Sequence, residues 1–267
     1  MYETMRPLSF GETLDGAFTL LRRNFSAFFG VALLPQIPVI LFWLLLPAVM
    51  GPADDAAPVL GAAPMLLAPY SLLVSFLVMG ALTHAAGVAY GGERPRIKTS
   101  LGQGLRRFLP IAAVTVIAWV LIGLGLLLLI VPGLLLMAMY FAVYAAVMIE
   151  GRGPLNALGR SRRLSRGARA RILGVLIVAF LIAYLPIMAM VMFMGVSVGV
   201  TAAVSAASVA GTSVWLVALM QACSVIVAAV TTPFLILVSV LLYYDRRART
   251  EAPDLESAVA ALQDNAV

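Results

Sequence analysis

The stretch GRGPLNALGRSRRLSRGARAR, residues 151–171, decides how this chain is organised, because it places seven arginines between two blocks that carry no charge. The flanking blocks, 134–149 and 172–191, contain no Lys, Arg, Asp or Glu. Of all 267 residues only 11% are charged and 63% are hydrophobic, and the apolar residues come in long runs. A water-soluble domain needs more polar surface than this composition supplies. The sequence therefore predicts a membrane protein whose cations gather in a few short segments.

Six apolar segments are candidates to cross a bilayer, since about 20 apolar residues span the ~30 Å hydrocarbon core. They are residues 25–49, 65–90, 110–131, 134–149, 172–194 and 214–244. The third and fourth are separated only by the tripeptide VPG at 131–133, which we interpret as a tight turn between two antiparallel helices. Pro35, Pro38 and Pro233 are expected to kink or unwind the first and last spans.

The distribution of cations predicts the orientation. With six spans, the segments on one side are 1–24, 91–109, 150–171 and 245–267, and all eighteen Lys and Arg lie there. The segments on the other side carry only Asp54 and Asp55. Because cationic segments stay on the cytoplasmic side, we expect a multi-pass protein of the cytoplasmic (inner) membrane with both termini inside. One transmembrane domain is expected over residues 1–250, followed by a cytoplasmic tail, 251–267.

Amphipathic segments precede three of the spans. Ser9 and Glu12 have the spacing of a capping box, which satisfies free amide groups at a helix start, and an apolar stripe follows. Ser100 and Gln103 repeat this pattern, and Pro154 begins a weaker third copy. Such helices lie in the membrane interface rather than across it. The predicted fold is all-α: six transmembrane helices as three hairpins, each preceded by an interfacial helix, at about 9–24, 100–109 and 154–168.

Three stretches carry a resemblance to a known family: LSFGETLDGAFTLLRRNF (8–25), IVPGLLL with AVMIEGRGPLNALGRSRRLSRG (within 130–167), and TTPFLILVSVLLYYDRRART (231–250). In their order and spacing they resemble the glycerophosphoryl diester phosphodiesterase membrane-domain family. The resemblance implies a stand-alone multi-pass protein that has no catalytic domain. The sequence departs from the family at 161–164, where SRRL stands in place of a common aromatic residue.

Enzymatic chemistry finds little support in the sequence. The chain has one histidine, His84, and one cysteine, Cys223, both inside apolar runs. The acids show no metal-ligand spacing, and no nucleophile elbow, zinc-protease or phosphate-loop motif occurs. We therefore expect a non-enzymatic protein with no catalytic residues, no metal and no cofactor. No nucleic-acid partner is expected either, because neither a binding module nor stacking aromatic residues accompany the arginines.

Two interpretations of function stay open, ahead of a third that we rank last, an enzyme that uses lipid substrates at the interface. The first is an accessory or scaffold protein that engages anionic lipids or a partner at the cytoplasmic face; the second is a transporter or channel for lipids or other amphiphilic or apolar small molecules. For the first, an arginine collar is expected to contact lipid headgroups, each cation contributing about 1 kcal/mol near an anionic surface. A protein partner or homo-oligomer stays open as well. The collar consists of Arg22, Arg23, Arg106, Arg107, Arg160, Arg162, Arg163 and Arg166, and an interfacial anchor is expected at Tyr243, Tyr244, Asp245 and Arg246.

Overall fold

The computed structural model describes residues 8–50, 53–205 and 214–264, and the regular elements within these ranges are all helical. Six segments are long and apolar enough to span a membrane. They are Phe25–Val49, Ala62–Tyr90, Phe108–Leu128, Ile130–Met148, Arg169–Met190 and Trp215–Glu251. The predicted fold class, an all-α protein with six candidate membrane spans, is confirmed.

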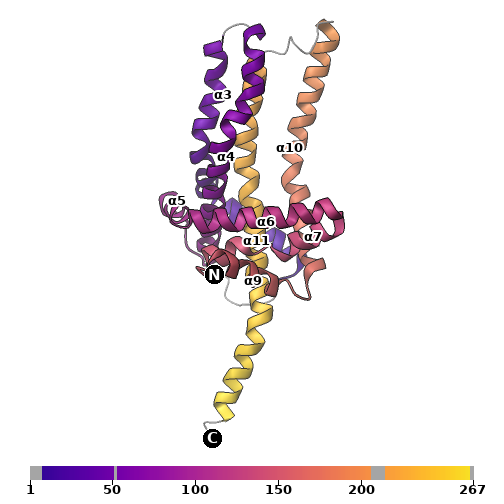
Figure 1. Ribbon diagram of the computed structural model, residues 1–267. Coiled ribbons are helices and arrows are strands. Elements are labelled where there is room, and N and C mark those ends of the chain that lie inside the picture. Colours follow the sequence, from indigo (N-terminus) through magenta and orange to yellow (C-terminus); the bar gives the residue numbers. More distant parts are fainter. Residues whose placement is uncertain (1–7, 51–52, 206–213, 265–267) are drawn as a thin grey trace.

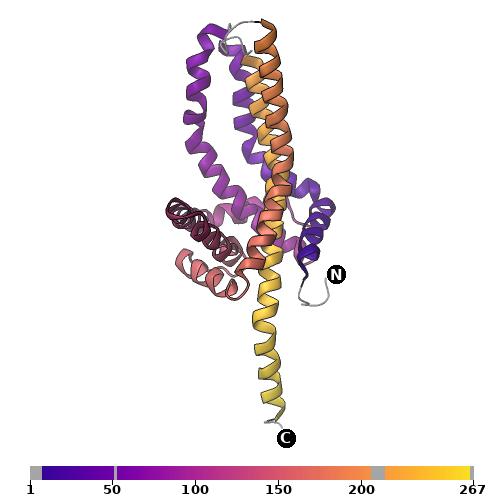
Figure 2. The same cartoon turned by 90° about the vertical axis from the view of Figure 1, so that its right-hand side faces the viewer.

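Four long helices stand side by side and form the upright part of the molecule (Figures 1 and 2). They are α3 (Ile37–Met50), α4 (Ala53–Tyr90), α10 (Arg169–Ser205) and α11 (Val214–Asp264). α11 contacts the other three. α3, α4 and α10 are apolar on all sides rather than along one stripe, as expected for helices surrounded by lipid and other helices. α11 continues past Glu251, so the predicted tail begins inside this helix.

Prolines affect the first and last spans differently. The first apolar segment is divided into α2 (Phe25–Leu33), the 3-10 turn η1 (Leu34–Gln36) and α3, which confirms the break expected at Pro35 and Pro38. A proline ring removes an amide donor and clashes with the preceding helical turn. α11 runs through Pro233 without interruption, so this proline does not unwind the helix; the alternative expectation, a kink, stays a prediction. The turns that follow Pro233 are buried in the core that α11 shares with α1, α2 and α4.

α6 (Phe108–Leu128) and α7 (Ile130–Met139) form a hairpin whose turn is the single extended residue Leu129. The turn expected at 131–133 is wrong, because these residues lie in the first turn of α7, where proline is tolerated. Gly133 serves the contact between the helices instead. A Cβ atom at Gly133 would lie 2.7 Å from the backbone nitrogen of Leu126, and one at Gly125 would lie 3.0 Å from the Cα of Gly133.

The fourth apolar segment is interrupted. α7 ends at Met139, and α8 (Val143–Met148) begins after a short turn. Ser161, from another helix, fills the interruption: its hydroxyl donates to the carbonyl of Met139 (2.8 Å) and accepts from the amide of Ala142 (3.1 Å). The predicted segment 134–149 is therefore two helices, and the Ser161 side chain satisfies one carbonyl and one amide at the interruption.

A short helix precedes each of the three helix pairs, as predicted. They are α1 (Phe10–Arg23), α5 (Ile97–Arg106) and α9 (Pro154–Leu164). The capping box at α1 is confirmed, because Ser9 and Glu12 each accept a hydrogen bond from the other's backbone N–H. The first turn of α9 begins at Pro154, also as predicted.

The capping box expected at Ser100 and Gln103 is wrong. α5 begins three residues earlier, after the extended residue Arg96, so that Ser100 lies inside the helix. Ser100 is fully buried, and its hydroxyl is 3.4 Å from Nδ1 of His84 on α4.

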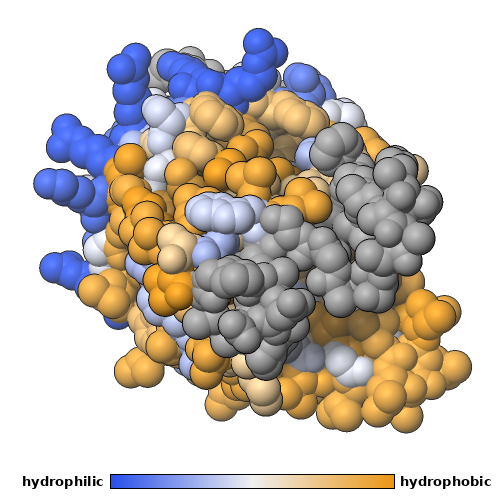
Figure 3. All heavy atoms as spheres, turned by 90° about the horizontal axis from the view of Figure 1, so that it is seen from above, coloured by the Kyte–Doolittle hydropathy of each residue, from blue (hydrophilic) through white to orange (hydrophobic). Residues whose placement is uncertain are grey.

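The second helix pair differs in direction from the first and third. The α6–α7 hairpin lies across the upright helices, horizontal in Figure 1 and nearly end-on in Figure 2. It lies near the height of the short helices, toward the end from which α11 projects; this end, where the Lys and Arg residues lie, is called the cationic end below. Seen from the opposite end, the described surface is largely hydrophobic, with hydrophilic side chains projecting along part of its rim (Figure 3).

Candidate functional site

Charged residues gather at the cationic end, where α11 passes α1, α8, α9 and the start of α10. Two acids organise this region, Asp245 on α11 and Glu150 after α8. We call Leu8, Arg171, Asp245 and Arg249 the Asp245 junction. The Glu150 junction comprises Glu150, Arg152, Arg160, Tyr243, Arg247 and Glu251.

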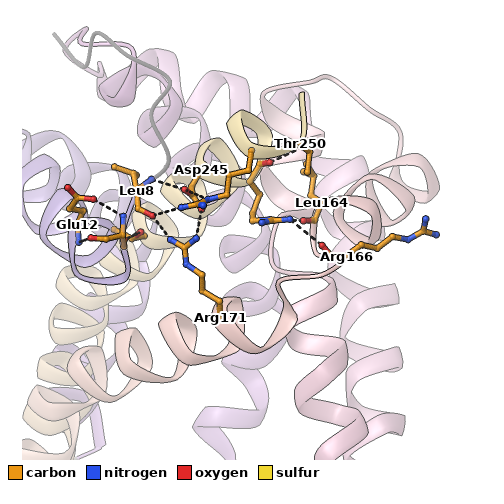
Figure 4. A network of polar contacts seen from close by, with 11 residues as sticks. Leu8, Glu12, Leu164, Arg166, Arg171, Asp245 and Thr250 are labelled. Carbon is orange, nitrogen blue, oxygen red and sulfur yellow. Dashed lines mark hydrogen bonds and ion pairs between the residues drawn. The ribbon is translucent and has the colours of Figure 1, made fainter. Parts of the chain in front are cut away.

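The Asp245 junction ties the start of the chain to α10 and α11 (Figure 4). The Asp245 side chain is 0% exposed. Its Oδ1 accepts hydrogen bonds from the backbone N–H of Leu8 (2.8 Å) and from Nε of Arg249 (3.0 Å), and its Oδ2 is 3.5 Å from Nη1 of Arg171. Both arginines also donate to the carbonyl of Leu8. Two cations and one amide thus compensate a carboxylate that would be costly to bury alone.

Arg246, next to this junction, holds the end of α9. Its Nε donates to the carbonyl of Leu164 (2.9 Å), and its Nη2 donates to that of Arg166 (3.2 Å). The last carbonyls of a helix have no partner inside it and carry partial negative charge. A guanidinium group supplies both the missing hydrogen bonds and a compensating positive charge. Gly167, with a φ of 73°, then reverses the chain into α10. The arginine-rich stretch 151–171 is thereby fixed against α11.

The Glu150 junction links α8, α9 and α11. Oε1 of Glu150 accepts from Nε of Arg160 (2.8 Å) and from the hydroxyl of Tyr243 (2.5 Å), while Oε2 accepts from Arg152. Arg160 also pairs with Glu251 on α11, which in turn accepts from Nε of Arg247 at 2.7 Å. The result is a chain of alternating charges that runs from the end of α8 along α9 to α11.

Hydrogen bonds set the protonation of Glu150. Burial alone would raise the pKa of its carboxyl group, but the hydrogen bonds from Tyr243, Arg152 and Arg160 outweigh burial and lower this pKa below its ordinary value. Glu150 is therefore a carboxylate that the neighbouring donors hold in its charged form. An acid held in this way suits a structural ion pair better than proton transfer.

The residues expected as an interfacial anchor are held by the protein itself. Tyr243 is fully buried, and Tyr244 stacks on Tyr90 of α4 with ring centroids 4.0 Å apart. Asp245 and Arg246 make the internal contacts described above. Their role as an interfacial anchor stays a prediction.

The structure divides the predicted arginine collar into two groups. Arg160 belongs to the Glu150 junction, and Arg107 donates to the carbonyl of Gly151 at 3.1 Å. The other six project outward and make no ion pair with the described residues. We call these six the outward arginines: Arg22, Arg23, Arg106, Arg162, Arg163 and Arg166.

Aromatic side chains accompany the outward arginines on the N-terminal helices. α1 buries Ala17, Leu20 and Leu21, while Phe18 is partly exposed and packs on Phe234 of α11 with ring centroids 4.4 Å apart. Phe25, which opens α2, is exposed beside Arg22 and Arg23 in the sequence. A helix with one buried face, exposed aromatics and arginines at its end has the composition of a helix that lies at a membrane surface.

A cavity of about 300 Å³ opens near the cationic end of α4. His84, Glu93 and Tyr244 supply its polar lining, and Val88, Met148 and Ile149 are among its apolar residues. Among the described residues, no group of three or more His, Cys, Asp or Glu side chains could hold a metal ion. Cys223 is half-buried in the apolar part of α11.

Several residues of these junctions escaped the sequence interpretation, in particular Glu150, Arg171 and Arg249. The available signal was an acid at the end of an apolar span, directly beside arginines, as in IEGR and YDRRAR.

No protein-family model, curated protein or solved structure matches the chain.

Proposed function

We propose that this polytopic protein is a non-enzymatic accessory or scaffold protein of the cytoplasmic membrane that binds anionic lipids at its cytoplasmic face. The observation that carries the proposal is the division of the arginines. Internal acids and a backbone carbonyl hold Arg107, Arg160 and Arg171 in fixed contacts. Six arginines on short helices or directly after one are exposed and make no ion pair with the described residues. The proposed topology, with both termini cytoplasmic, follows from the cations on one side of the spans.

Anionic headgroups match these cations chemically. Seventeen of the eighteen Lys and Arg residues are arginine, whose planar guanidinium group can bind a phosphate with two parallel hydrogen bonds. Each cation near an anionic surface contributes about 1 kcal/mol, which corresponds to about fivefold in lipid preference. We propose that the chain is related to the phosphodiesterase membrane-domain family, which it resembles. That relationship would support a stand-alone membrane role.

Lipid analysis tests this proposal. Arg162, Arg163 and Arg166 are replaced together by Gln, which leaves both junctions intact, and the co-purifying lipids are quantified by mass spectrometry. We expect the ratio of phosphatidylglycerol and cardiolipin to phosphatidylethanolamine to fall severalfold. The matched control replaces the same residues by Lys and should retain the ratio, because the charge is kept. An unchanged ratio in a correctly inserted Gln variant would restrict these arginines to a role in topology.

The cavity beside His84 supports a second candidate, transport of lipids or other amphiphilic or apolar small molecules. Its lining combines an imidazole, a carboxylate and a phenol with apolar side chains, as an amphiphile would require. A Cβ atom at Gly87 would lie 3.5 Å from Ile149 and 3.8 Å from the Tyr244 hydroxyl, so Gly87→Leu would fill this space. If transport is the function, Gly87→Leu should slow the movement of a fluorescent phospholipid in proteoliposomes; equal rates in empty vesicles and with the unmodified protein would exclude it.

A further inference from the structure

The start of α6, the charged helix α5 before it and α8, which follows the hairpin, meet α4 at one height. A Cβ atom at Gly80 would lie 3.3 Å from Ile111 near the start of α6, 3.4 Å from the Cα of Gly104 on α5, and 3.7 Å from the sulfur of Met148 on α8. α5 carries exposed Lys98 and Arg106, and such a helix belongs at the level of the lipid headgroups. α6 therefore begins close to that level, and the chain is back at it by Met148. The end of α7 is tied to α9, another charged helix, by the hydrogen bond that Ser161 donates to the carbonyl of Met139.

The direction of the hairpin keeps its tip near the same level. Since it runs horizontally across the upright helices in Figure 1 and is seen nearly end-on in Figure 2, its length adds little to its depth along these helices. A hairpin that crossed the bilayer would instead run parallel to the upright helices. α7 contacts α10, which places the hairpin against the upright bundle and not away from it.

The surface of the hairpin requires an apolar environment. No charged residue occurs between Arg107 and Glu150, and α6 is apolar on all sides. Its exposed side chains include Leu109, Val120 and Leu127, which are 76%, 54% and 83% exposed. A helix without a polar face cannot lie half in water, unlike α1 and α5. Its natural surroundings are acyl chains just beneath the headgroups.

The upright helices indicate where that layer begins. On the part of α4 whose side chains are described, the large exposed hydrophobic residues lie between Met65 and Leu73. Gly80 follows seven residues later, about two helical turns nearer the cationic end. The hairpin thus joins α4 at the edge of its lipid-facing surface.

We infer that the α6–α7 hairpin does not cross the bilayer but lies parallel to it, inserted among the acyl chains of the leaflet on the cationic side. The partner of its exposed face is that acyl-chain layer. Only the remaining four candidate spans would then cross. The charge pattern is the same in both arrangements, because the hairpin returns to its starting side either way.

Depth measurements by electron paramagnetic resonance test this inference. In a chain carrying Cys223→Ser, single spin labels are placed at Leu109, Val120 and Leu127, and depth is measured from oxygen and nickel-chelate collisions in vesicles of phosphatidylethanolamine and phosphatidylglycerol. We expect the three depths to agree within one helical turn, ~5 Å. A crossing hairpin would place Val120 deeper than the ends by about half of the ~30 Å core. That result would overturn the inference.

A control on an upright helix keeps the result interpretable. Labels at Ile177, Leu185 and Met192 of α10, which are also exposed, must differ in depth if the assay resolves position. A second measurement uses Leu129→Cys at the tip. A membrane-impermeant maleimide added on the non-cationic side should leave this thiol unmodified, although it reacts in detergent; reaction from that side would also overturn the inference. Neither outcome depends on which lipids the outward arginines select.

Discussion

The Asp245 junction and the α6–α7 hairpin hold their helices together by opposite means. At Asp245, a carboxylate with no exposed surface joins Leu8, Arg171 and Arg249 through charged hydrogen bonds and an ion pair. In the hairpin, Gly125 and Gly133 bring the backbones of α6 and α7 into direct contact. The first region depends on charge and is sensitive to it; the second depends on volume.

This difference follows from the surroundings of each region. Near the headgroups, water and charges are available, and arginines can keep part of their surface hydrated while they pair with a buried acid. Among acyl chains, side chains of two helices gain little by leaving lipid, so close contact between small residues is what favours association. The two regions should therefore respond differently to loss of charge and to added volume.

The largest effect is expected from Asp245→Asn. The variant removes the negative charge between Arg171 and Arg249 and turns an amide donor toward one of them. Because breaking one side of a buried ion pair leaves uncompensated charge, the free energy of unfolding should fall by about 3 kcal/mol. The measurement is the unfolding midpoint in a mixed-micelle denaturant titration.

Asp15→Asn is the matched control for this prediction. Asp15 is exposed on α1 and makes no ion pair with the described residues, so its variant should stay within about 0.5 kcal/mol of the unmodified protein. Equal midpoints for the two variants would show that the Asp245 junction contributes little to stability.

A smaller effect is expected where the hairpin lacks space. Gly133→Ala adds a methyl group 2.7 Å from the Leu126 backbone nitrogen, so the two helices must separate. Overpacking of this kind costs about 1–3 kcal/mol. Gly123→Ala, on the same helix as Leu126 but with no atom within 4 Å of the added carbon, should be neutral or slightly stabilising in the same titration. If both variants behave alike, the close contact is not what holds the hairpin.

The Glu150 junction should give a pH-dependent effect of about 1–2 kcal/mol. The pKa of Glu150 is lowered by its donors, so the folded state binds this proton less readily than the unfolded chain. Its stabilisation is present above the ordinary pKa of 4.5 and is lost as the pH falls through the lower, folded value. Glu150→Gln should reduce stability at pH 7 and lose less than the unmodified protein on acidification. Parallel acid profiles for the two proteins would contradict this assignment.

Sequence patterns predicted the parts of the fold that depend on local chemistry. Apolar run length gave the six candidate spans, and the Ser9–Glu12 spacing gave the start of α1. Long-range contacts were not predictable. The Ser100 hydroxyl contacts His84, and the Ser161 side chain fills the interruption after α7. The crosswise direction of the hairpin was hidden for a related reason, because run length and charge do not encode the angle between helices.

At the candidate site, the sequence identified the cations but not their directions. Arg160 and Arg162 are two residues apart, yet one faces Glu150 and the other projects outward. Helical periodicity separates them only when the position of the acid is known, and Glu150 lies outside α9. The division into internal and outward arginines therefore needed the tertiary structure.

The smallest effect on stability is expected at the outward arginines. It tests the difference between arginines that pair inside the protein and the outward arginines. Arg166→Gln should change the free energy of unfolding by no more than about 0.5 kcal/mol, because its exposed side chain has no partner among the described residues. Arg249→Gln, also on the cationic end, removes a donor to both Asp245 and Leu8 and should cost clearly more. The same denaturant titration in neutral detergent measures both. If Arg166 binds a headgroup as we propose, adding phosphatidylglycerol to the micelles should stabilise the unmodified protein more than Arg166→Gln. A marked loss of stability for Arg166→Gln in neutral detergent would assign this arginine to the fold, and the lipid would then have one fewer cation to bind.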